Sequence, residues 1–205
     1  MKRFLTLFLL IGTAWGLHAG NVVTDFAAKA ASSRVAFRYT YSVNNAVKLQ
    51  GSGSALVQGD AFYVQGDGLD VYCDGKTRWT VDKTAKEVIV ESVDQDFRDY
   101  AANPALLVAS VGDAFSVQSV AESKFKGKAC TAGVLSPKEK MDMSLLKLYF
   151  VKNQLAGAAV TMKDGTVTEF VVSDLVFSEV RPAGKEFTFD LGALDNSWVV
   201  TDLTD

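Results

Sequence analysis

The residues of this sequence best suited to metal chemistry are three acids that lie close together. Asp94 and Asp96 form an Asp-x-Asp pair, with Asp99 nearby, and such a pair can bind a hard cation through carboxylate oxygens. The same acids also suit the first turn of a helix, where negative charge interacts favourably with the helix dipole. We favour the helix interpretation and therefore expect neither a metal site nor a cofactor.

The N-terminal residues have the features of a signal peptide, residues 1–19. Lys2 and Arg3 precede an apolar stretch at 4–16, and small side chains predict cleavage after Ala19. A membrane anchor is the alternative, but this stretch is too short to span a bilayer comfortably. The residue directly after the cleavage site is Gly20 and not a cysteine, so we expect the mature protein to be exported and soluble rather than acylated.

Removal of the signal peptide limits the chemistry that the chain can do. The only histidine is His18, so the mature protein has none, which excludes Ser-His-Asp and Cys-His catalysis. The sequence has no nucleophile motif either, and we predict that the protein is not an enzyme. Loss of Lys2 and Arg3 takes the 21 basic residues to 19 against 24 acidic ones, a net charge of −5. Such a charge argues against nucleic acid as a partner.

Cys73 and Cys130 are the only two cysteines of the chain. In an exported protein they can form a disulfide, which would stabilise the fold by on the order of 4 kcal/mol because it closes a long loop. They can equally be two buried thiols on neighbouring strands. Both alternatives stand, because the geometry that a disulfide requires is not encoded in spacing.

Short strands that fold back on one another are predicted for residues 51–82. Apolar side chains alternate there with small or polar ones, which is typical of a sheet with one apolar face. Gly59-Asp60, Gly66-Asp67-Gly68 and Asp74-Gly75 mark the turns, because Gly and Asp tolerate the positive φ of tight hairpins. We interpret this meander as the beginning of a large curved sheet.

An amphipathic helix and an aromatic strand open the mature chain. Residues 21–32 have strong helix propensity and place their apolar side chains on one side at helical spacing. Residues 34–43 alternate strictly, with Phe37, Tyr39 and Tyr41 on one face. Such a stripe is most often plain core, so it indicates a buried sheet face before it indicates a binding site.

The segment 94–110 is predicted to be helical. A first turn covers residues 97–102, and Asn103 can cap a second helix. This second helix contains Leu106 and Leu107, and it is short and very apolar. We expect it to be buried against the sheet.

Most of the remaining chain has the alternation and turn signals of strands. The further predicted strands are residues 87–92, 114–120, 128–135, 145–151, 155–162, 166–172 and 186–190. No linker, low-complexity segment or repeat interrupts them, so residues 20–205 are predicted to form a single domain. Its expected fold class is α+β, a long antiparallel meander with helices on one face.

The apolar side chains of this sheet and of the second helix form the candidate binding surface. A curved sheet of many strands is not easily filled by its own side chains, and incomplete filling leaves an apolar cavity. The alternative is a completely filled core. The candidate cavity residues are Phe37, Tyr39, Tyr41, Phe62, Val64, Leu69, Trp79, Leu106, Leu107, Phe150, Phe170 and Val172.

Several short motifs follow one another along the mature chain. The most specific is the D-G-K-x-x-W-x-x-D pattern of residues 74–82. The others are Phe62-Tyr63-Val64, Asn103-Pro104-Ala105-Leu106-Leu107, Leu135-Ser136-Pro137, Asp164-Gly165-Thr166 and Phe187-Thr188-Phe189. In this order, after a signal peptide, they resemble the periplasmic outer-membrane lipoprotein carriers, the LolA-like family. The resemblance covers nearly the whole mature chain.

The resemblance implies an open antiparallel half-barrel whose helices form a lid over a hydrophobic cavity. It implies a monomeric periplasmic carrier that binds the acyl chains of lipoproteins, or another lipid. Such a carrier receives its cargo from an inner-membrane lipoprotein-releasing transporter and passes it to an outer-membrane acceptor. By position, Phe62 and Val64 correspond to cavity-lining strand positions, and Leu106 and Leu107 to the lid helix.

The sequence departs from the family pattern at one turn. The family's best-known carriers have a basic residue that latches the lid, placed before the strand that contains Phe62. Here that turn is Gln58-Gly59-Asp60, which has no base. The alternative function is a periplasmic sensor of the same fold that binds a protein partner in envelope-stress signalling. Such sensors usually carry a second domain, for which this sequence leaves no room.

Overall fold

The computed structural model describes residues 21–44, 48–93 and 99–204. The predicted signal peptide, residues 1–19, lies outside these ranges, as do Asp94 and Asp96 of the acidic cluster. Within the described ranges, no helix is both long and apolar enough to cross a membrane.

The described chain forms two α-helices, two short 3₁₀ helices and twelve strands. The helices are α1 (Val22–Ala31), α2 (Pro104–Ser110), η1 (Lys185–Phe187) and η2 (Leu191–Ala193). The strands are β1 (Arg34–Asn44), β2 (Leu49–Gln58), β3 (Ala61–Gly66), β4 (Leu69–Cys73), β5 (Thr77–Asp82), β6 (Glu87–Ser92), β7 (Phe115–Phe125), β8 (Lys128–Pro137), β9 (Met143–Val151), β10 (Gln154–Met162), β11 (Val167–Ser178) and β12 (Val199–Leu203).

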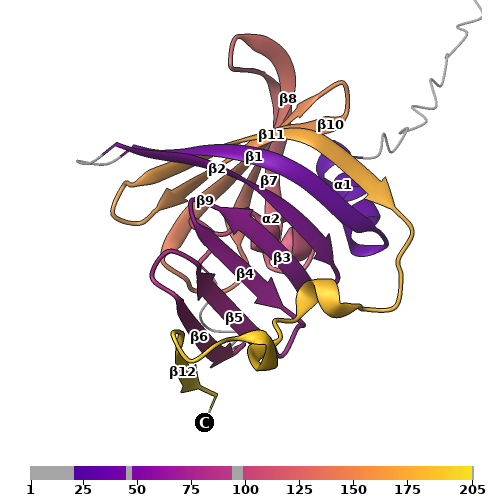
Figure 1. Ribbon diagram of the computed structural model, residues 1–205. Coiled ribbons are helices and arrows are strands. Elements are labelled where there is room, and N and C mark those ends of the chain that lie inside the picture. Colours follow the sequence, from indigo (N-terminus) through magenta and orange to yellow (C-terminus); the bar gives the residue numbers. More distant parts are fainter. Residues whose placement is uncertain (1–20, 45–47, 94–98, 205) are drawn as a thin grey trace, which may run out of the picture.

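All twelve strands belong to one sheet, in the order β12-β6-β5-β4-β3-β2-β1-β11-β10-β9-β8-β7. Every neighbouring pair is antiparallel except β12 and β6, which are parallel. The sheet does not close, and Figure 1 shows it bending around the helices. The α+β open half-barrel that the sequence predicts is therefore confirmed.

The predicted turns of the first meander are also present. Gly59 has a φ of 58°, Asp67 of 52°, Gly68 of 84° and Gly75 of 94°. These left-handed values favour glycine or aspartate over other residues. The turn residues therefore fix where the strands β2 to β5 begin and end.

Two predictions of secondary structure are wrong. Residues 186–190 do not form a strand but begin in η1 and continue as irregular chain. Phe187 is buried and Phe189 partly buried there without any strand pairing, so their alternation reflects packing of the side chains alone. Residues 99–102, the described part of the first predicted helical turn, form a turn instead. There the Asp99 carboxylate accepts hydrogen bonds from the N–H groups of Ala101 and Ala102, which competes with helix formation. Strand β12 was not predicted.

The face of the sheet that carries α1 and α2 holds the main hydrophobic core. On β1, the side chains of Val35, Phe37 and Tyr39 are all buried in this core. The register extends the same face across β2 and β3, because Ala55 pairs with Phe37 on one side and with Val64 on the other. The alternation predicted for the first strand is therefore confirmed.

A second hydrophobic cluster lies on the opposite, outer face of β4 to β6. Trp79 pairs with Tyr72 and with Val90 across the ladder. The cluster consists of Val81, Val88 and Val90, with Tyr72, Trp79, Phe189, Leu194 and Trp198 packed against them. The C-terminal segment thus crosses the outer face before it pairs as β12 beside β6 (Figure 1). The prediction that Trp79 faces the cavity is wrong.

Cys73 and Cys130 are both buried and unbonded. Cys73 is on β4 and Cys130 on β8, and six strands lie between them in the sheet. The structure therefore has two buried thiols with no bond between them, and the two thiols are not on neighbouring strands. Burial raises the pKa of the Cys73 thiol, which keeps it protonated.

Helix α1 approaches the sheet closely at Gly133 on β8. Asn21 caps the helix, since its side chain accepts a hydrogen bond from the N–H of Val23 at 3.0 Å. Val23 is buried, and a Cβ on Gly133 would lie 2.3 Å from its Cγ2 atom. Any side chain at position 133 would therefore push the helix away from the sheet.

We predict that Gly133→Ala lowers the free energy of unfolding by about 1–3 kcal/mol, the usual effect of overpacking. The loss should be smaller in a Val23→Ala background, because the atom that the new methyl meets is then absent. Urea unfolding of the four proteins of this double-mutant cycle measures the coupling. Equal losses in both backgrounds would show that the close approach of α1 does not require this glycine.

Candidate functional site: an apolar pocket beneath helix α2

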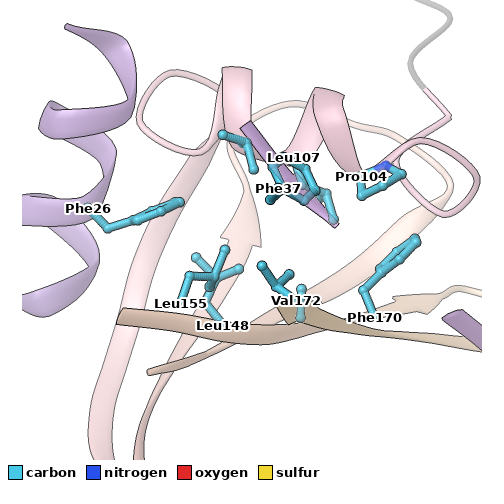
Figure 2. A pocket seen from close by; sticks show the side chains of 10 residues that line it. Phe26, Phe37, Pro104, Leu107, Leu148, Leu155, Phe170 and Val172 are labelled. Atoms are coloured by element: carbon cyan, nitrogen blue, oxygen red, sulfur yellow. The ribbon is translucent and has the colours of Figure 1, made fainter. Parts of the chain in front are cut away.

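An apolar pocket lies between helix α2 and the sheet. Figure 2 shows Phe26 reaching into it from α1 at one end, with Pro104 and Phe170 at the other. The ten residues that line it are Phe26, Phe37, Pro104, Leu107, Val108, Leu148, Leu155, Ala158, Phe170 and Val172. All ten side chains are apolar, so the pocket offers no side-chain hydrogen bond and selects for hydrocarbon.

The pocket is almost filled by its own side chains, and we call it closed in this sense. About 10 Å³ remains open to the centre of a water-sized sphere, which is room for about one water molecule. The lining side chains occupy the rest of the space, and Phe37 and Phe170 are only 3% and 1% exposed. An acyl chain of many methylenes therefore fits only after part of the lining has moved.

Helix α2 is the element that closes the pocket. It is seven residues long, and the Asn103 side chain caps it by accepting a hydrogen bond from the N–H of Ala105 at 2.9 Å. A helix this short is not stable in isolation, so its position depends on the burial of Leu107 and Val108 against the sheet. Because no strand pairing includes α2, the helix can move away while every ladder of the sheet stays intact.

Aromatic side chains of β1 support one wall of the pocket. The rings of Tyr39 and Tyr41 pack against Phe170, with centroids 6.1 and 6.4 Å away. A glycine leaves room for them, since a Cβ on Gly53 would lie 2.6 Å from the Tyr39 hydroxyl oxygen. The Tyr41 hydroxyl donates a hydrogen bond to the Asp67 carboxylate at 2.7 Å. These contacts hold Phe170 in place beside the pocket.

The Tyr39 hydroxyl remains protonated well above its ordinary range. Burial raises the pKa of Tyr39 from 10.0 to about 12, and the negative charge of Asp67 contributes in the same direction. Between these two values, the folded protein holds a proton that the unfolded chain has lost. The stabilisation is complete below pH 10 and is lost as the pH rises through about 12.

We predict that the free energy of unfolding falls as the pH rises from about 10 to about 12, and that it falls less steeply in Tyr39→Phe. Part of the slope should remain, because burial also raises the pKa of Tyr63. Urea unfolding followed by fluorescence at several pH values measures both slopes. An identical slope in the two proteins would show that Tyr39 does not titrate differently in the folded state.

The sequence-based candidate residues fall into three groups. Phe37, Leu107, Phe170 and Val172 line the pocket. Tyr39, Tyr41, Phe62, Val64, Leu106 and Phe150 belong to the surrounding core or pack against it. Leu69 is 40% exposed next to the turn at Gly68, and Trp79 is on the outer face, so the structure places neither of them in the pocket.

Six lining residues were not among the candidates, namely Phe26, Pro104, Val108, Leu148, Leu155 and Ala158. Phe26 lies on the apolar side of the first predicted helix, and Leu148 and Leu155 lie in predicted strands. Alternation in those strands identifies Leu148 as one of a buried set. It does not say which buried residues meet α2, because that depends on the register of distant strands.

The turn that lacks the family's basic residue contacts the C-terminal segment. The Gln58 side-chain amide donates to the carbonyl of Arg181 at 2.6 Å and accepts from its N–H at 3.1 Å. The following Asp60 lines a separate polar hollow with Tyr100, which precedes α2. In this chain, Gln58 therefore ties the turn to the outer segment and not to α2.

The solved structures that match this chain share little sequence with it. An uncharacterized conserved protein from Thermus thermophilus matches with a TM-score of 0.52 and 9% identity, over 88% of this chain and 96% of that one. LolA superfamily protein NE2245 from Nitrosomonas europaea matches with a TM-score of 0.45 and 11% identity, over 82% and 97%. MucB in complex with MucA(peri) matches with a TM-score of 0.36 and 14% identity, over 82% and 59%. A search of curated proteins found no match.

The family is defined by a sequence match. The family model of the outer membrane lipoprotein carrier protein LolA matches residues 62–190, more than half of the chain. The chain therefore belongs to the LolA family, which is a family of carrier proteins, and the resemblance found in the sequence is confirmed.

Proposed function

We propose that this protein is a periplasmic carrier that binds the acyl chains of lipoproteins, or of another lipid, in the pocket beneath α2. It would carry them, as a monomer, from an inner-membrane transporter to an outer-membrane acceptor. The observation that supports this proposal best is the pocket itself: ten apolar side chains from α1, the short helix α2 and the sheet meet there, and no polar side chain lines it.

An acyl chain can replace the contacts that α2 makes in the closed state. The face of α2 and the face of the sheet are both apolar, and each buries the other when the pocket is closed. A chain inserted between them keeps both surfaces away from water. Burial of hydrocarbon contributes about 0.8 kcal/mol for each methylene, or roughly 11 kcal/mol for a chain of about fourteen. Opening of the lid offsets part of this gain.

Transfer of the cargo then requires no covalent chemistry. Because binding comes from burial of hydrocarbon, release needs only a second apolar site that binds the chains more tightly. The proposal therefore assigns no catalytic residue, in agreement with a family of carriers.

Adjacent leucines of α2 allow a matched test of the pocket. Leu107 lines it, whereas Leu106 is half-buried and does not. We predict that Leu107→Trp fills the pocket and weakens binding of a triacylated lipopeptide at least about tenfold, the effect of losing two buried methylenes. Leu106→Trp should change the affinity little. Intrinsic fluorescence or native mass spectrometry measures binding, and circular dichroism checks the fold.

Equal losses in the two variants, with both folded, would mean that the pocket is not where the chains bind. Photo-crosslinking from position 107 in cells, followed by mass spectrometry, then identifies the cargo. Trapped acylated lipoproteins would support the carrier. Capture of one protein without acyl chains would favour a partner-binding sensor of the same fold.

A further inference from the structure

A second hollow lies at the surface between α1 and the adjacent end of the sheet. Its volume is about 220 Å³, against about 10 Å³ for the closed pocket. Its lining residues are Val22, Asp25, Phe26 and Lys29 from α1, Asn153, Gln154 and Leu155 from the β9–β10 connection and β10, and Leu175 and Phe177 from β11. We call this hollow the α1 groove.

The α1 groove and the closed pocket share a wall. Phe26 and Leu155 line both of them. Figure 2 shows Phe26 pointing from α1 into the space above Leu155. The Phe26 ring also packs edge-on against Phe150 at 5.7 Å and Phe177 at 6.1 Å between centroids. Displacement of the Phe26 side chain would therefore connect the groove with the pocket.

The groove has two chemical zones. Its apolar side chains, including Leu155, Leu175 and Phe177, are buried or half-buried and form its floor, whereas the polar residues Asp25, Lys29, Asn153 and Gln154 are exposed. The Lys29 ammonium lies 4.3 Å from the centre of the Phe177 ring, which holds this cation beside the floor. Hydrocarbon below and hydrogen-bonding groups above match the part of a lipid where an acyl chain joins its ester or amide.

Another hollow, which we call the opposite hollow, is lined by the last two residues of α2, Ala109 and Ser110. Charged side chains contribute much of its remaining lining, namely Asp60, Asp113, Lys138, Glu139 and Lys140, and it shares no lining residue with the closed pocket. Of the two, only the α1 groove is continuous with the pocket through shared side chains.

We propose that the α1 groove is the portal through which an acyl chain enters and leaves the pocket, with Phe26 as its gate. The polar side chains of the groove then contact the ester or amide at the head of the chain. This inference rests on the proposed function and adds the route that the cargo takes and the side chain that controls it.

A bulky label at the mouth of each hollow tests the route. Gln154 in the α1 groove and Lys140 in the opposite hollow are both exposed. Gln154→Cys and Lys140→Cys can be modified with a polyethylene glycol maleimide, while Cys73 and Cys130 are protected by burial. Stopped-flow fluorescence then follows entry and release of a dansylated undecanoic acid. The unmodified variants and the wild-type protein are the controls.

We expect the label at position 154 to slow both entry and release at least about tenfold, and the label at 140 to change neither more than about twofold. The affinity should change little, because both rates fall together. Phe26→Ala should have the opposite effect and speed both rates, because the gate is removed.

Two results would overturn the portal while leaving the proposed function intact. The first is normal binding with slow entry caused by the label at 140 only, which would place the entrance at the opposite hollow. The second is no slowing by either label, which would mean that the chain enters beneath α2. If the unmodified wild-type protein binds neither this probe nor a triacylated lipopeptide, the proposed function itself fails.

Discussion

The pairing of β1 with β11 is the interaction on which the rest of the structure depends. It joins the strands β2 to β6 to the strands β7 to β10 in a single sheet. It also places Tyr39 opposite Val172 and Tyr41 opposite Phe170, so the aromatic face of β1 continues onto β11. Without this pairing, the two halves would each have an apolar face and no common wall for α2 to cover. The pocket exists because both halves contribute to that wall.

Helix α2 covers the wall of the sheet that an acyl chain would contact under the proposed function. If that proposal holds, the helix face and the chain compete for this wall, and the affinity for a lipid depends on how weakly α2 is held. Helix α2 is only seven residues long and five of these residues are buried, so its hold on the sheet comes from the burial of its own side chains. Binding and release can then be tuned by residues of α2 alone, without change to the sheet.

Local patterns predicted the elements well and the site only in part. Phe37 and Tyr39 are two residues apart in one strand, so the sequence alone could predict that their side chains share a face.

Trp79 was wrongly predicted to face the cavity. Alternation shows which residues of one strand share a face, but the pairing of Trp79 with Tyr72 decides which face of the sheet that is. Phe187 and Phe189 alternate as in a strand because Phe187 is buried and Phe189 partly buried, although neither residue belongs to a strand. Leu148 and Leu155 belong to the local hairpin of β9 and β10, but they face Phe37 across the pocket only because β10 pairs with β11 and β11 with the distant β1.

The central position of β1 has a consequence for how the chain folds. One edge of β1 pairs with β2, which is the next strand in the sequence. The other edge pairs with β11, which comes much later in the chain. Ser178 and Arg34, which pair across that ladder, are 144 residues apart. Until the late strand arrives, an aromatic strand has an open edge, which is a template for aggregation, and distant pairings of this kind form slowly. The folding chain therefore has the greatest need of a chaperone in the interval before its last long strand is available.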